Sequence, residues 1–530
     1  MSGSATPEER SASPTLRRWI WPGVTLLLAG VAQTALYLTY SEDRTMLIMT
    51  TLFVWPATIF SLLLWWVFGS GFTWKSRLIG LGSLLFVGGL VMSVATIEGF
   101  NGDMVPRVVW RWAPKAEAAA RNVPVAPQEG AVATPVLTAG PGDWVQFRGP
   151  DRAGVASGVT IPLSWSEATP PKKLWGKPIG VGWSSFAVIG DRIFTQTQVE
   201  QEEQVLCLDL ATGNVLWKHA DQTRFSEAMG GDGPRATPTF LEGKLYTLGA
   251  TGILNTFDAA TGKVLWSTNI LKDADATNIP WAMAGSPLIE DGLVIVNPGG
   301  KDGHSIAAYR ATDGQLMWSV GDYEASYTAP RVETIHGVRQ VLVFHAAGLS
   351  GLDPKTGKEF WMFPWVNQPK VNACQPILLP DQSLFLSCGY SVGSARIELT
   401  PAEPSWQVKP IWKTNKFRLK FNDGILKDGY IYGLDENRLA CLDIATGKIK
   451  WKGPPYGYGQ ILMTDNSILV SCENGELALV EPTPEKFVEI TKFRVLPDAT
   501  TWAHPVIAHG KLLVRNNQEL ACYQVETPPQ

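Results

Sequence analysis

The sequence predicts an all-β eight-bladed β-propeller of four-stranded antiparallel blades, preceded by an N-terminal bundle of three transmembrane α-helices. A short motif recurs at intervals of about 40 to 50 residues, which is typical of a propeller or another repeat array. Eight opening signals, one for each repeat, set the number of blades. Three long apolar segments precede the first repeat and predict the helices.

The motif reads small residue, apolar residue, Asp, two spacers, Thr-Gly, three spacers and Trp. It is clearest from Cys441 to Trp451, and a double interval before this copy implies a degenerate copy between residues 362 and 440. The other copies, two close and two looser, are Cys207 to Trp217, Thr256 to Trp266, Ala308 to Trp318 and Gly351 to Trp361.

The residue types of the motif predict a strand, a tight turn and a returning strand. The Asp can accept backbone N–H groups across the turn, and the Gly adopts a positive φ at no steric cost. The Trp has the largest apolar surface of the repeat, so we expect it to dock on the neighbouring blade. The tryptophans with this predicted role are Trp175, Trp217, Trp266, Trp318, Trp361 and Trp451.

Each repeat opens with a Pro or small residue, an apolar pair and a Gly/Asp turn ahead of a β-rich run. Residues 174–178 look like a returning strand without an opener, and the last repeat stops near Tyr523 without a Trp strand. We therefore expect residues 174–178 to complete the last blade, so that the ring closes without an open sheet edge. The openers lie at Ser185, Thr237, Ser286, Ala329, Gln375, Asp423, Ile461 and His504.

The repeat resembles the tryptophan-docking motif of pyrroloquinoline-quinone-type (PQQ-like) propellers over residues 143–526. The run from Trp144 to Pro150 and the run from Gly233 to Pro238 resemble a membrane-anchored bacterial branch of these propellers. The family includes quinoprotein dehydrogenases and also non-enzymatic members, such as the propeller lipoprotein of outer-membrane β-barrel assembly. The resemblance therefore implies a fold and leaves the choice between these functions open.

Charge and hydropathy divide the chain into four parts. Residues 1–18 form a polar tail, 19–98 an anchor, 99–142 a Pro/Ala-rich linker with a possible short helix at 116–120, and 143–526 the propeller. Each expected span, about 19–40, 46–70 and 78–97, is long enough to cross the hydrocarbon layer. The first run is too long for a cleaved signal peptide, and two more spans follow it.

The basic residues of the short loops predict the orientation of the anchor. Arg17 and Arg18 precede the first span, and Lys75 and Arg77 separate the second from the third. By the positive-inside rule the N-terminus is cytoplasmic, and three spans place the propeller outside the inner membrane, in the periplasm. The helices would contact membrane lipid, and an anchoring role is expected because the spans contain no charge suited to transport.

Charge and cysteine usage exclude several classes of function. A net charge of −4 gives no reason to expect a nucleic-acid partner, and six cysteines without a C-x-x-C pair make a zinc site improbable. Three cysteines share one small-residue position of the repeat and are expected to be packing thiols. Cys374 and Cys388 flank a predicted hairpin turn, so a disulfide between them is possible in an oxidising compartment.

Two groups of basic residues are candidate contacts for a ligand or partner. The run before blade six contains basic residues that alternate with apolar ones: Lys413, Lys416, Arg418 and Lys420. They form either a solvated strand face or a surface that binds an anion or a partner. Arg235 precedes the opener at Thr237, and Arg331 follows the opener at Ala329. Both are expected near a ring surface or the central channel. Both could instead pair with carboxylates.

A quinoprotein dehydrogenase would need a calcium held by carboxylate and amide oxygens, a base, a stacking aromatic and basic residues for the three quinone carboxylates. The chain has no adjacent Cys-Cys pair, its blades are short, and Asp423, Glu398 and Asn422 match no family ligand by motif. No nucleophile-elbow, zinc-protease or P-loop signature is present.

These observations favour a scaffold for extracytoplasmic protein partners, without catalytic, cofactor-binding or metal-binding residues. A PQQ- and calcium-dependent dehydrogenase of alcohols or sugars is the alternative.

Overall fold

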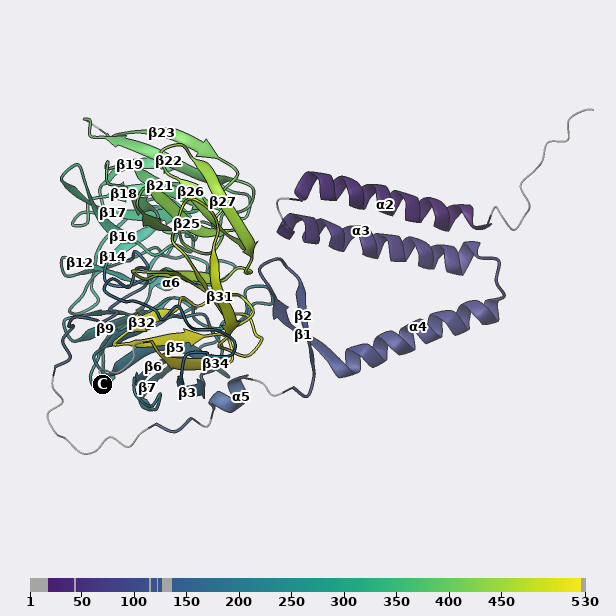
Figure 1. Ribbon diagram of the computed structural model, residues 1–530, viewed down its shortest axis with the longest axis horizontal. Coiled ribbons are helices and arrows are strands. Elements are labelled where there is room, and N and C mark those ends of the chain that lie inside the picture. Colours follow the sequence, from purple (N-terminus) through teal and green to yellow (C-terminus); the bar gives the residue numbers. More distant parts are fainter. Residues whose placement is uncertain are drawn as a thin grey trace, which may run out of the picture. The chain divides into compact units, whose positions relative to one another are not determined.

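The computed structural model describes residues 18–41, 44–113, 116–121, 123–125, 136–403 and 405–525. The chain forms two compact units, Met1–Ala113 and Pro114–Gln530. The first contains long helices and a hairpin, and the second contains the propeller (Figure 1). The predicted polar tail, except for Arg18, lies outside the described residues.

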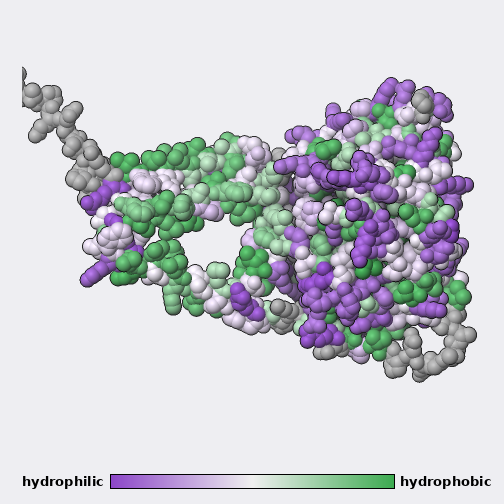
Figure 2. All heavy atoms as spheres, turned by 180° about the vertical axis from the view of Figure 1, so that it is seen from behind, coloured by the Kyte–Doolittle hydropathy of each residue, from purple (hydrophilic) through white to green (hydrophobic). Residues whose placement is uncertain are grey.

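Three long apolar helices make up most of the first unit, as predicted. They are α2 (Ile20–Tyr40), α3 (Arg44–Leu64), which the π-helical turn η1 (Trp65–Gly69) extends, and α4 (Trp74–Val94). Each is long and apolar enough to cross a membrane. Their apolar side chains face outward, for example Phe53 and Leu38, both 75% exposed. Figure 2 shows the hydrophobic surface of these helices and the more polar surface of the propeller.

Polar side chains connect the first two helices. Gln33 Nε2 donates to Thr51 Oγ1 at 3.0 Å, and Trp21 Nε1 donates to Ser61 Oγ at 3.1 Å. In an apolar environment such pairs satisfy polar groups that lipid cannot.

The third helix ends at Val94, and a β-hairpin follows it where the sequence analysis placed the end of the span and the start of the linker. Its strands are β1 (Ala95–Phe100) and β2 (Pro106–Trp110). The turn between them is stabilised by Asn101, whose Oδ1 accepts the Val105 N–H at 2.8 Å. An Asn turn between two short alternating strands was the signal of this hairpin in the sequence.

The second unit contains eight four-stranded antiparallel sheets, which confirms the predicted propeller. In blades 1 to 7 the strands run in chain order from the axis outward. The strands of blades 1 to 3 are β4 (Ala187–Ile189), β5 (Arg192–Val199), β6 (Glu202–Asp209), β7 (Val215–Asp221), β8 (Thr239–Leu241), β9 (Lys244–Leu248), β10 (Ile253–Asp258), β11 (Val264–Asn269), β12 (Leu288–Glu290), β13 (Leu293–Val296), β14 (Ile306–Arg310) and β15 (Leu316–Val320).

Blades 4 to 7 repeat this order. Their strands are β16 (Arg331–Ile335), β17 (Val338–His345), β18 (Gly348–Leu352), β19 (Glu359–Pro364), β20 (Ile377–Leu378), β21 (Leu384–Cys388), β22 (Gly393–Thr400), β23 (Gln407–Thr414), β24 (Ile425–Lys427), β25 (Tyr430–Asp435), β26 (Arg438–Asp443), β27 (Lys448–Pro455), β28 (Gln460–Met463), β29 (Ile468–Ser471), β30 (Glu476–Val480) and β31 (Glu489–Arg494).

Blade 8 joins distant parts of the chain. Its inner strands are β32 (Val506–Ala508), β33 (Lys511–Arg515) and β34 (Glu519–Gln524), and β3 (Lys173–Pro178) pairs antiparallel with β34 as the outermost strand. The closure predicted for residues 174–178 is thus confirmed. Arg515, which is 1% exposed, reinforces it by donating to the backbone of blade 1 at Gln196 O and Gly182 O.

The motif forms the expected turn, and the turn receives a tryptophan from the blade before it. Asp209 Oδ1 accepts the Thr212 N–H at 2.7 Å and the Thr212 hydroxyl at 2.6 Å, while Gly213 adopts φ +68°. Trp175 lies against Gly213, and its indole N–H donates to Leu210 O at 3.1 Å.

The same arrangement recurs around most of the ring. In each case an indole N–H donates to a backbone oxygen of the next blade: Trp217 to Ala259, Trp266 to Ala311, Trp318 to Pro354, Trp412 to Ile444 and Trp451 to Thr483. Trp412 belongs to the degenerate copy and was not identified from the sequence. Trp361 differs, because its N–H donates to Gln340 Oε1 within its own blade.

Two short helices complete the second unit. They are α5 (Ala116–Ala120), at the position where the sequence allowed a helix, and α6 (Ile270–Asp273), which follows blade 2 and is capped by Asn269.

Gly262→Ala should destabilise the propeller more than Gly292→Ala. Both glycines have a positive φ, +73° and +76°, so alanine costs about 1–2 kcal/mol of backbone strain at either position. Only at Gly262 does the added Cβ meet a docking ring, 2.6 Å from Trp217 Cδ2, whereas nothing lies within 4 Å at Gly292. Displacing the indole should add about 1–3 kcal/mol. Thermal unfolding of the full chain in detergent, followed by near-UV circular dichroism, compares the two midpoints; equal midpoints would contradict the docking argument.

Candidate functional site

Residues 144–156 run through the centre of the propeller and contact the inner strands of several blades. Trp144 forms a β-bridge with Val188 of blade 1, and Val145 O accepts the Phe240 N–H of blade 2 at 2.8 Å. Farther along, Val155 bridges Met463 of blade 7. We call residues 144–156 the axial segment.

Two arginines of the axial segment bind the residues that open other blades. Arg152, 3% exposed, donates through Nη2 to Pro287 O at 2.7 Å and through Nη1 to Pro330 O, at the starts of blades 3 and 4. Its Nε donates to Gln146 Oε1 at 3.0 Å. Burial, and then the charge of Arg331, lower the pKa of Arg152 to about 9.

Arg148 makes the corresponding contacts on the other side of the axis. Its Nη2 donates to Gly424 O of blade 6 at 2.9 Å, and its Nη1 lies 3.3 Å from Asp423 Oδ2. Asp423 also accepts the Gln375 N–H at 2.6 Å and lies 3.2 Å from His504 Nε2. Burial alone would raise the pKa of Asp423, but Arg148 and His504 hold it below its usual value.

The axial segment therefore fills the middle of the ring with its own charges and hydrogen-bond donors. Gly154 permits this packing: its φ is +74°, and a Cβ there would lie 2.7 Å from Arg148 Nη2. The run from Trp144 to Pro150 resembles a branch of PQQ-like propellers, but its place at the axis was not predicted from the sequence. The only sequence signal for this axial position was the presence of isolated arginines near Gly and Pro in this run.

A second set of side chains lies just before the inner strands. Trp183, Phe421 and Trp502 each lie two residues before the position that opens a blade, Tyr458 lies three residues before one, and their rings form a continuous row. Ring centroids are 4.8 Å apart for Trp183 and Trp502, 5.4 Å for Trp502 and Phe421, and 5.0 Å for Phe421 and Tyr458. The equivalence of these positions within the repeat could have identified the row from the sequence.

Arg235 occupies the same offset in blade 2, and the structure gives it local partners. Its guanidinium donates to backbone oxygens of Gly230, Gly231 and Gly233 and lies 4.9 Å above the Phe225 ring. Burial lowers the pKa of Arg235 to about 10. This contact set holds the loop before blade 2.

Arg331, the other predicted channel arginine, also has partners. It pairs with Glu333 and donates through Nη1 to Pro376 O of the next blade at 3.0 Å. Arg331 and Arg235 are not brought together into one site, whereas Arg331 approaches Arg152 of the axial segment.

The basic run before blade six does not form one charged face. Lys413 and Lys416 are exposed, but Arg418 and Lys420 are 6% and 4% exposed. Arg418 lies 3.5 Å from Glu436, and the Lys420 ammonium lies 4.9 Å from the Tyr458 ring centroid. The alternation was misinterpreted because residues 417–420 are buried on both sides between neighbouring blades.

Cys374 and Cys388, which the sequence allowed to be paired, are both free thiols. Cys388 packs in a cluster with Trp361 and Trp365, and Cys374 packs in a different cluster with Phe417. Burial raises the pKa of Cys388 to about 11, so both cysteines act as small apolar side chains.

Three residues were considered as possible ligands of a cofactor-bound calcium. Asp423 and Asn422 are buried near the axis, whereas Glu398 is exposed on β22 beside Lys409. They do not converge. Within the part of the chain that the structure describes, no three His, Cys, Asp or Glu side chains lie close enough to hold a metal ion.

Comparison with known proteins finds relatives of the propeller. A family model described as outer membrane protein assembly factor BamB matches residues 201–453. The assembly factor BamB of Burkholderia pseudomallei is 24% identical over 319 residues, which are 55% of this chain and 74% of that protein. These matches support a PQQ-like propeller. The resemblance predicted from the repeat is confirmed.

Dehydrogenase members are also similar to this PQQ-like propeller. Quinohemoprotein alcohol dehydrogenase ADH-IIG of Pseudomonas putida is 30% identical over 148 residues, 25% of this chain and 19% of that protein. The solved structure of quinohemoprotein alcohol dehydrogenase ADHIIG from P. putida HK5 has a TM-score of 0.54 at 13% identity and covers 75% of this chain and 85% of that chain. That likeness concerns the fold alone.

Arg152→Met should loosen the axial segment of the PQQ-like propeller. The substitution leaves the Pro287 and Pro330 carbonyls buried without a donor, which costs roughly 2–4 kcal/mol. Hydrogen exchange over residues 144–156 should become faster, and the unfolding midpoint should fall. Arg310→Met is the matched control, because Arg310 is 39% exposed and pairs with Asp313 on the surface. Unchanged exchange in the Arg152 variant would contradict the proposed role of the guanidinium.

Glu203 makes the stability of the PQQ-like propeller dependent on pH. It is 4% exposed, and burial, followed by the charge of Asp221, raises its pKa to about 7. A raised pKa in the folded state favours the protonated form, so the stability present below about pH 4.5 is lost as the pH rises through about 7.

Glu203→Gln should therefore increase the free energy of unfolding at pH 8 by up to about 3 kcal/mol and raise the unfolding midpoint there. At pH 4.5 it should change both quantities little. Thermal unfolding at the two pH values measures the difference. Glu242→Gln, at an exposed position, should show no such dependence.

Proposed function

We propose that this chain is a membrane-anchored scaffold that holds extracytoplasmic protein partners and catalyses no reaction. The observation that carries the proposal is the filled axis of the propeller. Arg148 and Arg152 are committed to backbone oxygens and to Asp423, so the centre of the ring serves to hold the blades together. A rigid ring leaves its faces and rim for contact with other proteins.

The residues present do not fit PQQ and calcium. The quinone would need uncommitted cations for its three carboxylates and a converging set of oxygen ligands for the ion. The axial arginines already have partners, and Asp423, Asn422 and Glu398 do not converge. The alcohol dehydrogenase relative matches over only 19% of its own length, so its activity is not carried over.

The relative named as an outer membrane assembly factor supports a protein-holding role. Three apolar helices support anchoring in the inner membrane. With Lys75 and Arg77 on the cytoplasmic side, the N-terminus is cytoplasmic and the propeller lies in the periplasm.

Calorimetric titration of PQQ, with calcium present, into the full chain in detergent micelles tests the choice between the two functions. The expected result is heat of dilution only. Binding at one site with micromolar or tighter affinity, followed by quinone-dependent oxidation of an alcohol or sugar, would overturn the scaffold.

A second measurement tests partner binding directly. Photoreactive residues placed around both faces and the rim should form defined cross-links to extracytoplasmic proteins in living cells. An absence of adducts at every position would also overturn the scaffold.

A further inference from the structure

The outermost strands of the eight blades have one equivalent position. In blades 1 to 3 it lies two residues before the docking tryptophan, on the other side of a bulge in the pairing with the third strand. Any apolar side chain here lies at the open edge of a sheet. The residues at this position in blades 1 to 8 are Val215, Val264, Leu316, Glu359, Pro410, Ile449, Glu489 and Lys173.

Most blades carry the edge protection that natural sheets use. Glu359, Glu489 and Lys173 place a charge at the edge, and Pro410 removes a donor from it. Ile449 lies between Lys448 and Lys450. Charged residues and proline at an edge discourage pairing with another strand. In blades 1, 2 and 3 the residue at this position is apolar and does not have a charged residue on both sides.

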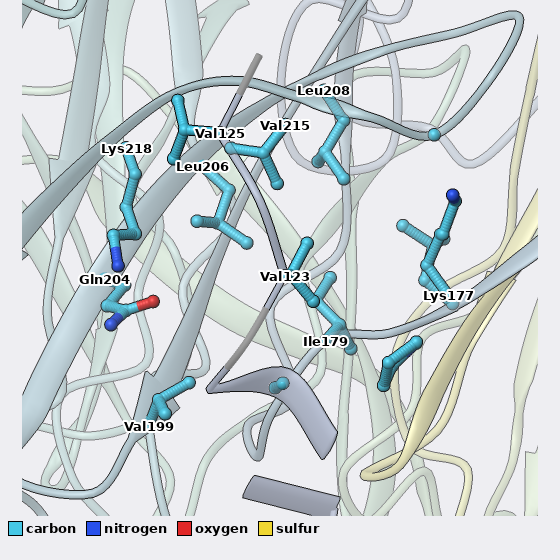
Figure 3. A pocket seen from close by; sticks show the side chains of 14 residues that line it. Val123, Val125, Lys177, Ile179, Val199, Gln204, Leu206, Leu208, Val215 and Lys218 are labelled. Carbon is cyan, nitrogen blue, oxygen red and sulfur yellow. The ribbon is translucent and has the colours of Figure 1, made fainter. Parts of the chain in front are cut away.

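In blade 1 the chain covers its own edge. Val125, which follows α5, forms a parallel β-bridge with Val215, and Val215 is only 3% exposed. Figure 3 shows Val123 and Val125 against Leu206 and Val215 in the pocket between these elements.

Charged contacts hold this covering segment in place. Glu117 of α5 lies 2.9 Å from Arg224, and Arg121 pairs with Glu200. The edge of blade 1 therefore binds an extended segment with alternating valines, fixed at one end by ion pairs.

In blades 2 and 3 the same edge is exposed. Val264 and Leu265 are 37% and 43% exposed, and Leu316 and Met317 are 41% and 46% exposed. These four residues lie at equivalent positions of two adjacent blades, immediately before Trp266 and Trp318. We call them the apolar edge. Exposed apolar side chains at the open edge of a sheet are characteristic of an interaction site.

We propose that the apolar edge of blades 2 and 3 binds an extended, β-branched apolar segment of a partner protein, as the edge of blade 1 binds Val123–Val125. The proposal rests on the scaffold function and specifies where and how it is exerted. The occupant adds as a strand whose backbone pairs with β11 or β15, and its alternate side chains pack on Leu265 and Met317. The apolar, β-branched character of the partner segment is inferred from Val123–Val125, because this segment contacts the equivalent position of blade 1.

The probe for this proposal is a synthetic peptide with the sequence of residues 116–127, carrying a diazirine side chain at the position of Val125. It is added to the full chain in detergent, irradiated, and its adducts are located by mass spectrometry. Blade 1 is already covered, so adducts should form on β11 or β15. Leu265→Lys with Met317→Lys should lower the yield at least about tenfold, since both apolar anchors are lost.

Ile411→Lys is the matched control. Ile411 is 47% exposed and also immediately precedes a docking tryptophan, Trp412, but its edge contains Pro410. This variant should keep the wild-type yield.

Three outcomes would overturn the proposal. They are adducts confined to blade 1, equal yields in the double variant and the wild type, and a dimer in sedimentation velocity that the double variant dissociates, which would assign the edge to a second copy of the chain. If the apolar edge does not bind the peptide but in-cell cross-links form at other surfaces, the proposed scaffold function still holds. Absence of in-cell cross-links everywhere would reject the scaffold itself.

Discussion

The contact between an indole ring and the glycine turn of the next blade is the interaction on which the propeller depends. Most blades have one tryptophan that their own sheet does not cover, and most of the receiving turns offer it a flat surface because a glycine there has no Cβ. The ring packs on that surface, and its N–H satisfies a carbonyl that would otherwise be buried without a donor. Since every contact joins neighbours, the same small unit can be repeated until the ring closes.

This dependence explains why the fold could be predicted from the sequence. The docking contact needs Asp, Gly and Trp at fixed spacings, and those spacings are visible without any structure. The copy that ends at Trp412 lacked the Asp and Gly and was not assigned, although its indole makes the same contact. The hairpin of β1 and β2 was missed for another reason: its two short strands follow directly on an apolar helix.

The centre of the propeller was much harder to predict. Arg148 and Arg152 carry no periodic signal, and their partners are backbone oxygens of residues 135 to 276 positions away in the chain. The same limit applied to Arg418 and Lys420, whose alternation suggested a solvated strand face, while burial depends on the loops of neighbouring blades. A sequence pattern reveals local periodicity. The contacts at the axis join residues that are far apart in the chain and follow no period, so the pattern does not predict them.

The strand that closes the ring has a consequence for synthesis. β3 is among the first propeller segments to leave the ribosome, and its partner β34 ends at Gln524, so blade 8 remains incomplete until nearly the whole domain has been made. During that interval β3 has no partner strand, and the last finished blade lacks the neighbour on which it packs. These surfaces need shielding until blade 8 is complete, and the domain acquires its final resistance to unfolding in one late step.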